Sequence, residues 1–286
     1  MTRKREGGGR PKQQGRTSRP AAKRAGAAVD ARVARLMETS VDLCDDDAKL
    51  QAALDLLRDP AEPTELRLAV VQAFQAASFS SASFDACRGE YLAALRQVAD
   101  TPDPELRQRV LGILARENDG WTQQRLLEGL REPEKALVPA EKALQLLSYD
   151  VHAEAYPVAR EIVRDPPNAT ARREALRLLA ADADSAPVFE KILLDKDELA
   201  ENRQLSAAAL QSLTPGRLQE HARDILLDDA EYPEIQATSL SALTQFGDLR
   251  SVSGDAALLK RVDALSTAAP AKVKRSAREF LRRYAE

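Results

Sequence analysis

Histidine is the side chain that most often carries acid–base or metal chemistry near neutral pH. This chain of 286 residues contains two, His152 and His221. They fall on different predicted helices, and neither is followed by a glutamate, so neither starts a His-Glu metal motif. We therefore predict that both histidines are solvated or cap a helix.

Two acidic pairs could in principle bind calcium. Asp182-Ala183-Asp184 and Asp195-Lys196-Asp197 both begin like a calcium-binding loop, which also needs glycine at its sixth position and glutamate at its twelfth. Those positions hold Pro187 and Leu193 in one segment, and Ala200 and Ser206 in the other. We interpret both pairs as acids at helix junctions.

Other chemical signatures are also missing from the sequence. The segment Gly7 to Lys12 lacks the spacing of a phosphate-binding loop, and no Gly-x-Ser-x-Gly sequence occurs. Cys44 and Cys87 are too few for a disulfide framework or a metal cluster, so we expect small buried apolar side chains. The sequence predicts no catalytic residue, no metal, no cofactor, no small-molecule substrate and no enzymatic activity.

The elements that would position a site are predicted to be helices. Apolar residues make up 44% of the chain but aromatic residues only 4%, which favours helices packed on helices. Seven segments share apolar or small residues at positions i, i+4, i+5 and i+8, one face of a helix. They begin at Leu66, Leu106, Pro139, Ala171, Leu205, Ile235 and Val273.

Each segment is preceded by another apolar helical stretch, and a proline separates the two in six of the seven cases. The spacing between segments is that of a two-helix repeat. The last template position is always large and apolar, whereas position i+4 is small in five segments. Arg278, at position i+5 of the seventh segment, is the exception expected of a repeat whose outer face is not covered.

Asp103-Pro104-Glu105-Leu106-Arg107, followed by Val110 to Leu114, resembles a HEAT repeat. The resemblance covers roughly residues 40 to 286. It implies an all-α fold, an α-solenoid of about seven helix-pair repeats over residues 29–286. HEAT-like iron hydroxylases share this architecture but require paired His-Glu motifs, which this chain lacks.

The resemblance also implies a ladder of polar contacts from repeat to repeat. In the family, an aspartate in the turn and an arginine opening the second helix form it, which here would be Asp103 with Arg107. Basic residues at matching positions would extend the ladder, namely Arg67, Arg172 and Lys274. Because the other matching positions are Ala140, Ser206 and Gln236, we expect the ladder to be broken in the middle.

The charge divides the chain into two parts. Residues 1–28 contain nine Lys or Arg and one acid, Glu6, a net charge of +8, whereas the remainder carries -11. Glycine and proline are frequent in residues 1–28, which we predict to be a disordered basic tail. Because no apolar segment follows it and no long apolar run occurs elsewhere, we expect a cytoplasmic protein that does not enter a membrane.

If the second helices line a concave surface, as in the family, position i+6 points outward. We predict that this surface contacts the partner, although a merely solvated face is the alternative. The candidate residues are Gln72, Gln145, Arg173, Arg177 and Gln211.

We therefore expect a non-catalytic scaffold that binds a protein partner. One alternative is nucleic-acid binding through the basic tail, which the charge of -11 on the remainder opposes. Another is a lyase or chaperone subunit similar to the HEAT-like phycobilin lyases, although no residue identifies a chromophore pocket.

Overall fold

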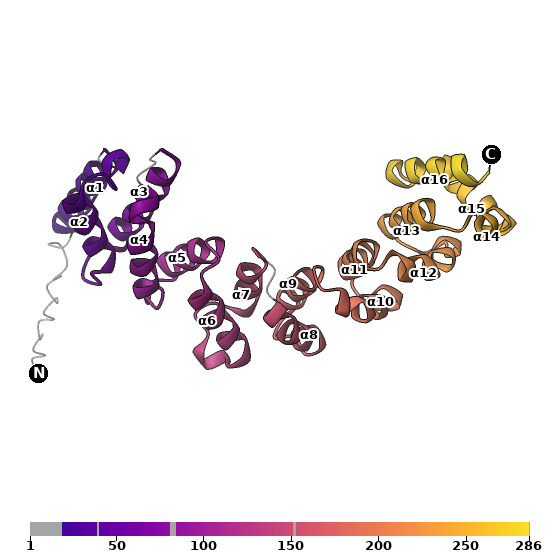
Figure 1. The fold of residues 1–286 in the computed structure, drawn as a ribbon, viewed down its shortest axis with the longest axis horizontal. Helices are drawn as coiled ribbons and strands as arrows, with labels where there is room; N and C mark the ends of the chain where they lie inside the picture. Colours follow the sequence, from indigo (N-terminus) through magenta and orange to yellow (C-terminus); the bar gives the residue numbers. More distant parts are fainter. Residues whose placement is uncertain (1–18, 39, 81–83, 151–152, 286) are drawn as a thin grey trace, which may run out of the picture. The chain divides into compact units, whose positions relative to one another are not determined.

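The computed structural model describes residues 19–38, 40–80, 84–150 and 153–285. These residues confirm the predicted all-α class, because they form sixteen α-helices and four short 3-10 helices but no β-strand (Figure 1). None of the described helices has the length and apolar character needed to cross a membrane. The chain forms two compact units, residues 1–114 and 115–286.

The N-terminal unit contains α1 (Arg19–Glu38), α2 (Asp47–Arg58), α3 (Thr64–Ser80), α4 (Phe84–Val98) and most of α5 (Pro104–Arg116). α3 packs against α1, α2 and α4. Its core includes Phe74, whose ring stacks on that of Tyr91 with the centroids 4.2 Å apart.

The first ten residues of α1, Arg19 to Ala28, were predicted to be disordered and are helical instead. The prediction gave too much weight to glycine and proline. Five alanines in this stretch favour a helix, and Pro20 lies in its first turn, where proline is tolerated. The rest of the predicted tail, residues 1–18, lies outside the described residues.

Cys44 and Cys87 form a disulfide bond, with their Cα atoms 5.8 Å apart. The prediction of two free apolar side chains is therefore wrong. A cysteine count excludes a framework of several disulfides, but it cannot exclude one bond between residues that the fold brings together. The bond joins the turn before α2 to α4.

The C-terminal unit contains eleven helices, all of them within the described residues. They are α6 (Gly120–Arg131), α7 (Ala140–Leu147), α8 (Tyr156–Arg164), α9 (Ala169–Leu179), α10 (Ala186–Leu194), α11 (Ala200–Leu213), α12 (Pro215–Leu227), α13 (Pro233–Phe246), α14 (Leu249–Ser253), α15 (Ala256–Ala268) and α16 (Ala271–Tyr284).

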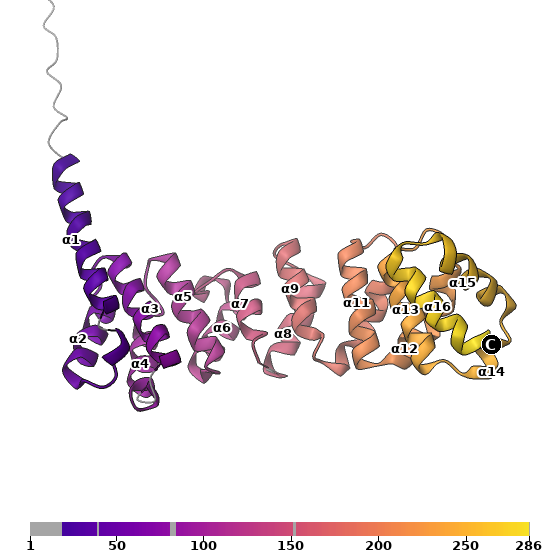
Figure 2. The ribbon, with the colours of Figure 1, turned by 90° about the horizontal axis from the view of Figure 1, so that it is seen from above.

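These helices pack as successive pairs: α6 with α7, α8 with α9, α10 with α11, α12 with α13, and α15 with α16. The second helix of each pair also packs against the second helix of the next, from α7 through α9, α11 and α13 to α16. Figure 2 shows α9, α11 and α13 following one another in chain order within this unit.

The repeat template gives the buried positions of most second helices. Ala171, Ala175, Leu176 and Leu179 of α9 are fully buried, as predicted. Pro139, by contrast, is exposed and precedes α7 rather than lying within it. In α16, Arg278 is exposed, as expected, whereas Phe280 and Tyr284 fill the core.

The template was placed three residues too late in α11. Asn202, Ser206, Ala207 and Leu210 are buried there, whereas Leu205 is only half-buried. Position i is polar in this helix, and the side chain of Asn202 is satisfied by donating to Glu198 Oε1 at 2.9 Å. A search for apolar residues therefore selected Leu205, almost one helical turn further along.

Candidate functional site

Three arginines at position i+1 of a second helix make the same contact. Arg67 Nε donates to the carbonyl oxygen of Leu57 at 2.9 Å, and Arg172 Nε donates to that of Val163 at 3.1 Å. Arg203 Nε donates to the carbonyl oxygen of Leu193 at 2.9 Å. Each arginine thus satisfies an otherwise unpaired carbonyl at the end of the preceding helix.

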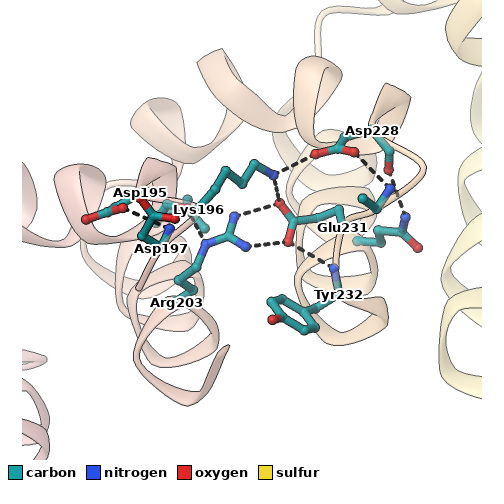
Figure 3. Close-up of polar contacts among 10 residues, drawn as sticks. Asp195, Lys196, Asp197, Arg203, Asp228, Glu231 and Tyr232 are labelled. Atoms are coloured by element: carbon teal, nitrogen blue, oxygen red, sulfur yellow. Dashed lines mark hydrogen bonds and ion pairs between the residues drawn. The ribbon is translucent and has the colours of Figure 1, made fainter. Parts of the chain in front are cut away.

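Arg203 also forms a bidentate ion pair with Glu231, which lies in the turn before α13 (Figure 3). Arg203 Nη1 donates to Glu231 Oε1 at 2.9 Å, and Nη2 donates to Oε2 at 2.7 Å. The side chains of the two residues are 3% and 0% exposed. Lys196 Nζ contacts the same carboxylate at 2.6 Å and Asp228 Oδ2 at 2.7 Å, which ties two successive turns together.

Burial alone would raise the pKa of Glu231. Hydrogen bonds from Arg203, Lys196 and the backbone N–H of Tyr232 outweigh that effect and hold the pKa below its ordinary value. The backbone N–H of Tyr232 donates to Glu231 Oε1 at 2.9 Å. Because both oxygens already have donors, we interpret this cluster as a structural connection rather than as an acid–base centre.

The same arrangement occurs at two other turns, each with the sequence Asp-x-x-Glu. Its aspartate accepts a hydrogen bond from the backbone N–H two residues later, in the turns that begin at Asp59, Asp195 and Asp228. Its glutamate pairs with an arginine of an earlier helix. The three pairs are Glu62 with Arg32 at 2.7 Å, Glu198 with Arg172 at 2.5 Å, and Glu231 with Arg203 at 2.7 Å.

These contacts correct the predicted ladder. Asp103 accepts from the backbone N–H of Leu106 and from the hydroxyl of Thr64, while Arg107 donates to the carbonyl oxygen of Thr101. In the described structure Asp103 and Arg107 are therefore not the pair that the resemblance implied. The expected break at Ser206 came from the register error, because the residue at that position is Arg203.

The predicted partner-contacting residues do not form one group. Gln72 is exposed on α3 in the N-terminal unit, and the other four lie in the C-terminal unit. Gln145 and Arg177 are exposed on α7 and α9, whereas Arg173 is half-buried and pairs with Glu201 of α11 at 3.1 Å. Gln211 is half-buried, and the corrected register replaces it with Ala208 at position i+6.

His221 does not have the solvated or capping role that we predicted. It is half-buried, and its Nε2 lies 2.6 Å from Glu190 Oε1. Glu220 is close enough that the three residues could each offer an atom to a metal ion, all within 4.8 Å of one another. His152 lies outside the described residues.

Arg217 Nη1 donates to the other oxygen of Glu190 at 2.6 Å. Hydrogen bonding to His221, opposed by burial and aided by Arg217, lowers the pKa of Glu190. A fixed guanidinium beside the carboxylate disfavours a second cation there. We interpret this group as an ion pair between α10 and α12 rather than a metal centre.

The acids that began like calcium loops lie at helix junctions, as predicted. Asp182 accepts from the backbone N–H of Asp184 and pairs with Arg160. Asp195 accepts from the backbone N–H of Asp197 at 3.0 Å. Their oxygens thus serve turns and a connection between helices.

No family model matches the chain, and no curated protein matches it. A solved structure of human deoxyhypusine hydroxylase in complex with glycerol matches 83% of this chain and 96% of its own chain. The identity is 15% and the TM-score 0.35.

This comparison corrects our prediction that the chain is not an enzyme. The matched structure is that of a hydroxylase, which is an enzyme.

Proposed function

We propose that residues 29–286 form an α-solenoid of HEAT-like repeats that binds a protein partner through the exposed side of its second helices. The observation that carries the proposal is the succession of helix pairs in the C-terminal unit, tied by the Arg172–Glu198 and Arg203–Glu231 contacts. Repeats held together in this way offer a continuous surface without needing a pocket.

Within this unit, Gln145 and Arg177 are the residues best suited to contact a partner. Both are exposed at position i+6. Gln145 accepts from Lys142, and Arg177 pairs with Glu174 of its own helix, so neither holds two repeats together. Their removal should therefore leave the fold intact.

Replacing Gln145 and Arg177 by alanine tests the proposal. We expect the double variant to lose partners that the parent protein captures in cross-linking and mass spectrometry, with an unchanged melting temperature. The matched control replaces Gln124 and Arg164, which are exposed on the first helices α6 and α8. Equal capture by all three proteins, or equal loss in both variants, would refute this surface.

A cytoplasmic location remains part of the proposal. The Cys44–Cys87 bond bears against it, because disulfides are rare in a reducing cytosol. The location of a fluorescent fusion in its source cell would decide between the reducing cytosol and an oxidising compartment.

A further inference from the structure

Helix α16 differs in charge from the rest of its unit. It contains six basic residues and one acid, Glu279, a net charge of +5. Residues 115–270 contain 18 basic and 27 acidic residues, a net charge of -9. The basic residues are Lys272, Lys274, Arg275, Arg278, Arg282 and Arg283.

Cations elsewhere in this unit are mostly paired with carboxylates. Arg160, Arg203 and Arg261 each bind an acid of another helix or turn. Four cations of α16 have no ion pair with any described residue. They are Lys274, Arg275, Arg278 and Arg282, and they line a hollow of about 630 Å³ together with Ala271, Glu279 and Leu281.

The repeat pattern shows which contact this face lacks. Position i+5 is Leu144 in α7, Leu176 in α9 and Leu240 in α13, all fully buried, but it is the exposed Arg278 in α16. Each earlier second helix from α7 to α13 is covered by the next one. Among the described residues, no such helix covers the α16 face that Arg278 occupies.

Position i+1 of α16 also lacks the partner that it has in earlier repeats. Arg172 and Arg203 hold this position in α9 and α11, and each pairs with a glutamate from the turn of the following repeat. Lys274 holds it in α16 and has no carboxylate partner among the described residues. A helix placed next to α16 that brought a carboxylate would complete the contact in the same way.

We propose that this face of α16 docks an acidic amphipathic helix of a partner protein. Its carboxylates would pair with Lys274, Arg275, Arg278 and Arg282, and its apolar residues would contact Leu281 and the aliphatic stems of the arginines. This surface lies on α16, whereas the residues singled out in the proposed function, Gln145 and Arg177, lie on α7 and α9. Nucleic acid fits less well, because the -9 charge of residues 115–270 repels phosphates and no aromatic side chain lines the hollow for base stacking.

Fluorescence anisotropy on the full chain tests the proposal with three labelled probes. The first is a helical peptide of about 20 residues with glutamates flanking a leucine face, and the second is a scrambled peptide of the same composition. The third is a DNA duplex of about 20 base pairs. We expect the amphipathic peptide to bind more tightly than either of the others.

The variant Arg275→Glu, Arg278→Glu, Arg282→Glu should weaken binding of the amphipathic peptide by about tenfold or more. The matched control is Arg131→Glu, Arg164→Glu, Lys191→Glu, three exposed cations of the same unit, which should change binding less than about threefold. Lys274→Glu should also weaken binding, whereas Lys272→Glu, outside the hollow, should not.

Equal weakening by the two triple variants would overturn the proposal, because binding would then depend on net charge alone. Binding that survives the α16 variant would place the peptide elsewhere, for example on the basic N-terminal segment. Tighter binding of DNA, lost in the α16 variant, would make the partner a nucleic acid. Circular dichroism of each variant excludes a loss of fold as the cause.

Discussion

Glu231 shows at the scale of one residue how this fold uses charge. Its side chain is fully buried, and its carboxylate receives donors from Arg203, Lys196 and a backbone N–H. A buried ion pair contributes little beyond a well-packed apolar pair, but removing one partner leaves a charge without compensation. The stability lost on replacing Glu231 therefore depends on whether the charge of Arg203 is also removed.

Glu231→Ala should lower the free energy of unfolding by about 3–5 kcal/mol, because Arg203 keeps its buried charge. The double variant Glu231→Leu, Arg203→Met should lose less than the single variant. Glu234→Ala, an exposed glutamate on α13, serves as the control and should cost less than about 0.5 kcal/mol. Urea unfolding measures all three, and a single variant as stable as the control would contradict the structural role of Glu231.

At the scale of elements, the disulfide fastens the turn before α2 to α4. It closes a loop over a sequence separation of 43 residues and thereby restricts the unfolded chain. Cys87 is almost fully buried, whereas Cys44 is half-buried. The bond should stabilise the N-terminal unit.

Replacing both cysteines by alanine should lower the free energy of unfolding by about 2–4 kcal/mol. A reducing agent should destabilise the parent protein by a similar amount. It should leave the double variant unchanged, because that variant has no disulfide and therefore serves as the control for the reductant. Thermal unfolding with and without reductant measures both effects. Two titratable thiols in the native protein, purified without reductant, would show that the bond is absent.

The sequence predicted the elements better than the contacts between them. Apolar spacing placed α9 and α13 in the correct register because their buried positions are mostly apolar. It misplaced α11, where two of the buried positions hold the polar residues Asn202 and Ser206. The Asp-x-x-Glu turns that begin at residues 59, 195 and 228 are visible in the sequence. Their role could not be predicted, because each glutamate pairs with an arginine far away in the sequence, as Glu231 does with Arg203.

At the scale of the whole molecule, most of the connections between described residues that depend on ionised carboxylates lie in the C-terminal unit. Hydrogen bonds and nearby cations hold the pKa values of several acids there below their ordinary range. They are Glu190, Glu198, Asp228, Glu231 and Asp255. A carboxyl group with a lowered native pKa stabilises the fold at neutral pH, and this contribution is lost as the pH falls through the native value.

The C-terminal unit should therefore lose stability as the pH drops below the ordinary carboxyl pKa of about 4.3, because the unfolded chain then binds more protons than the native one. Trp121 is the only tryptophan and lies on α6, so its fluorescence reports on this unit during an acid titration. The Glu231→Ala variant should begin less stable and show a shallower dependence on pH, since one of the titrating groups is gone. Equal dependence of stability on pH in parent and variant would mean that Glu231 has the same pKa in the folded and unfolded chain. That result would contradict the lowered pKa that its contacts with Arg203 and Lys196 produce.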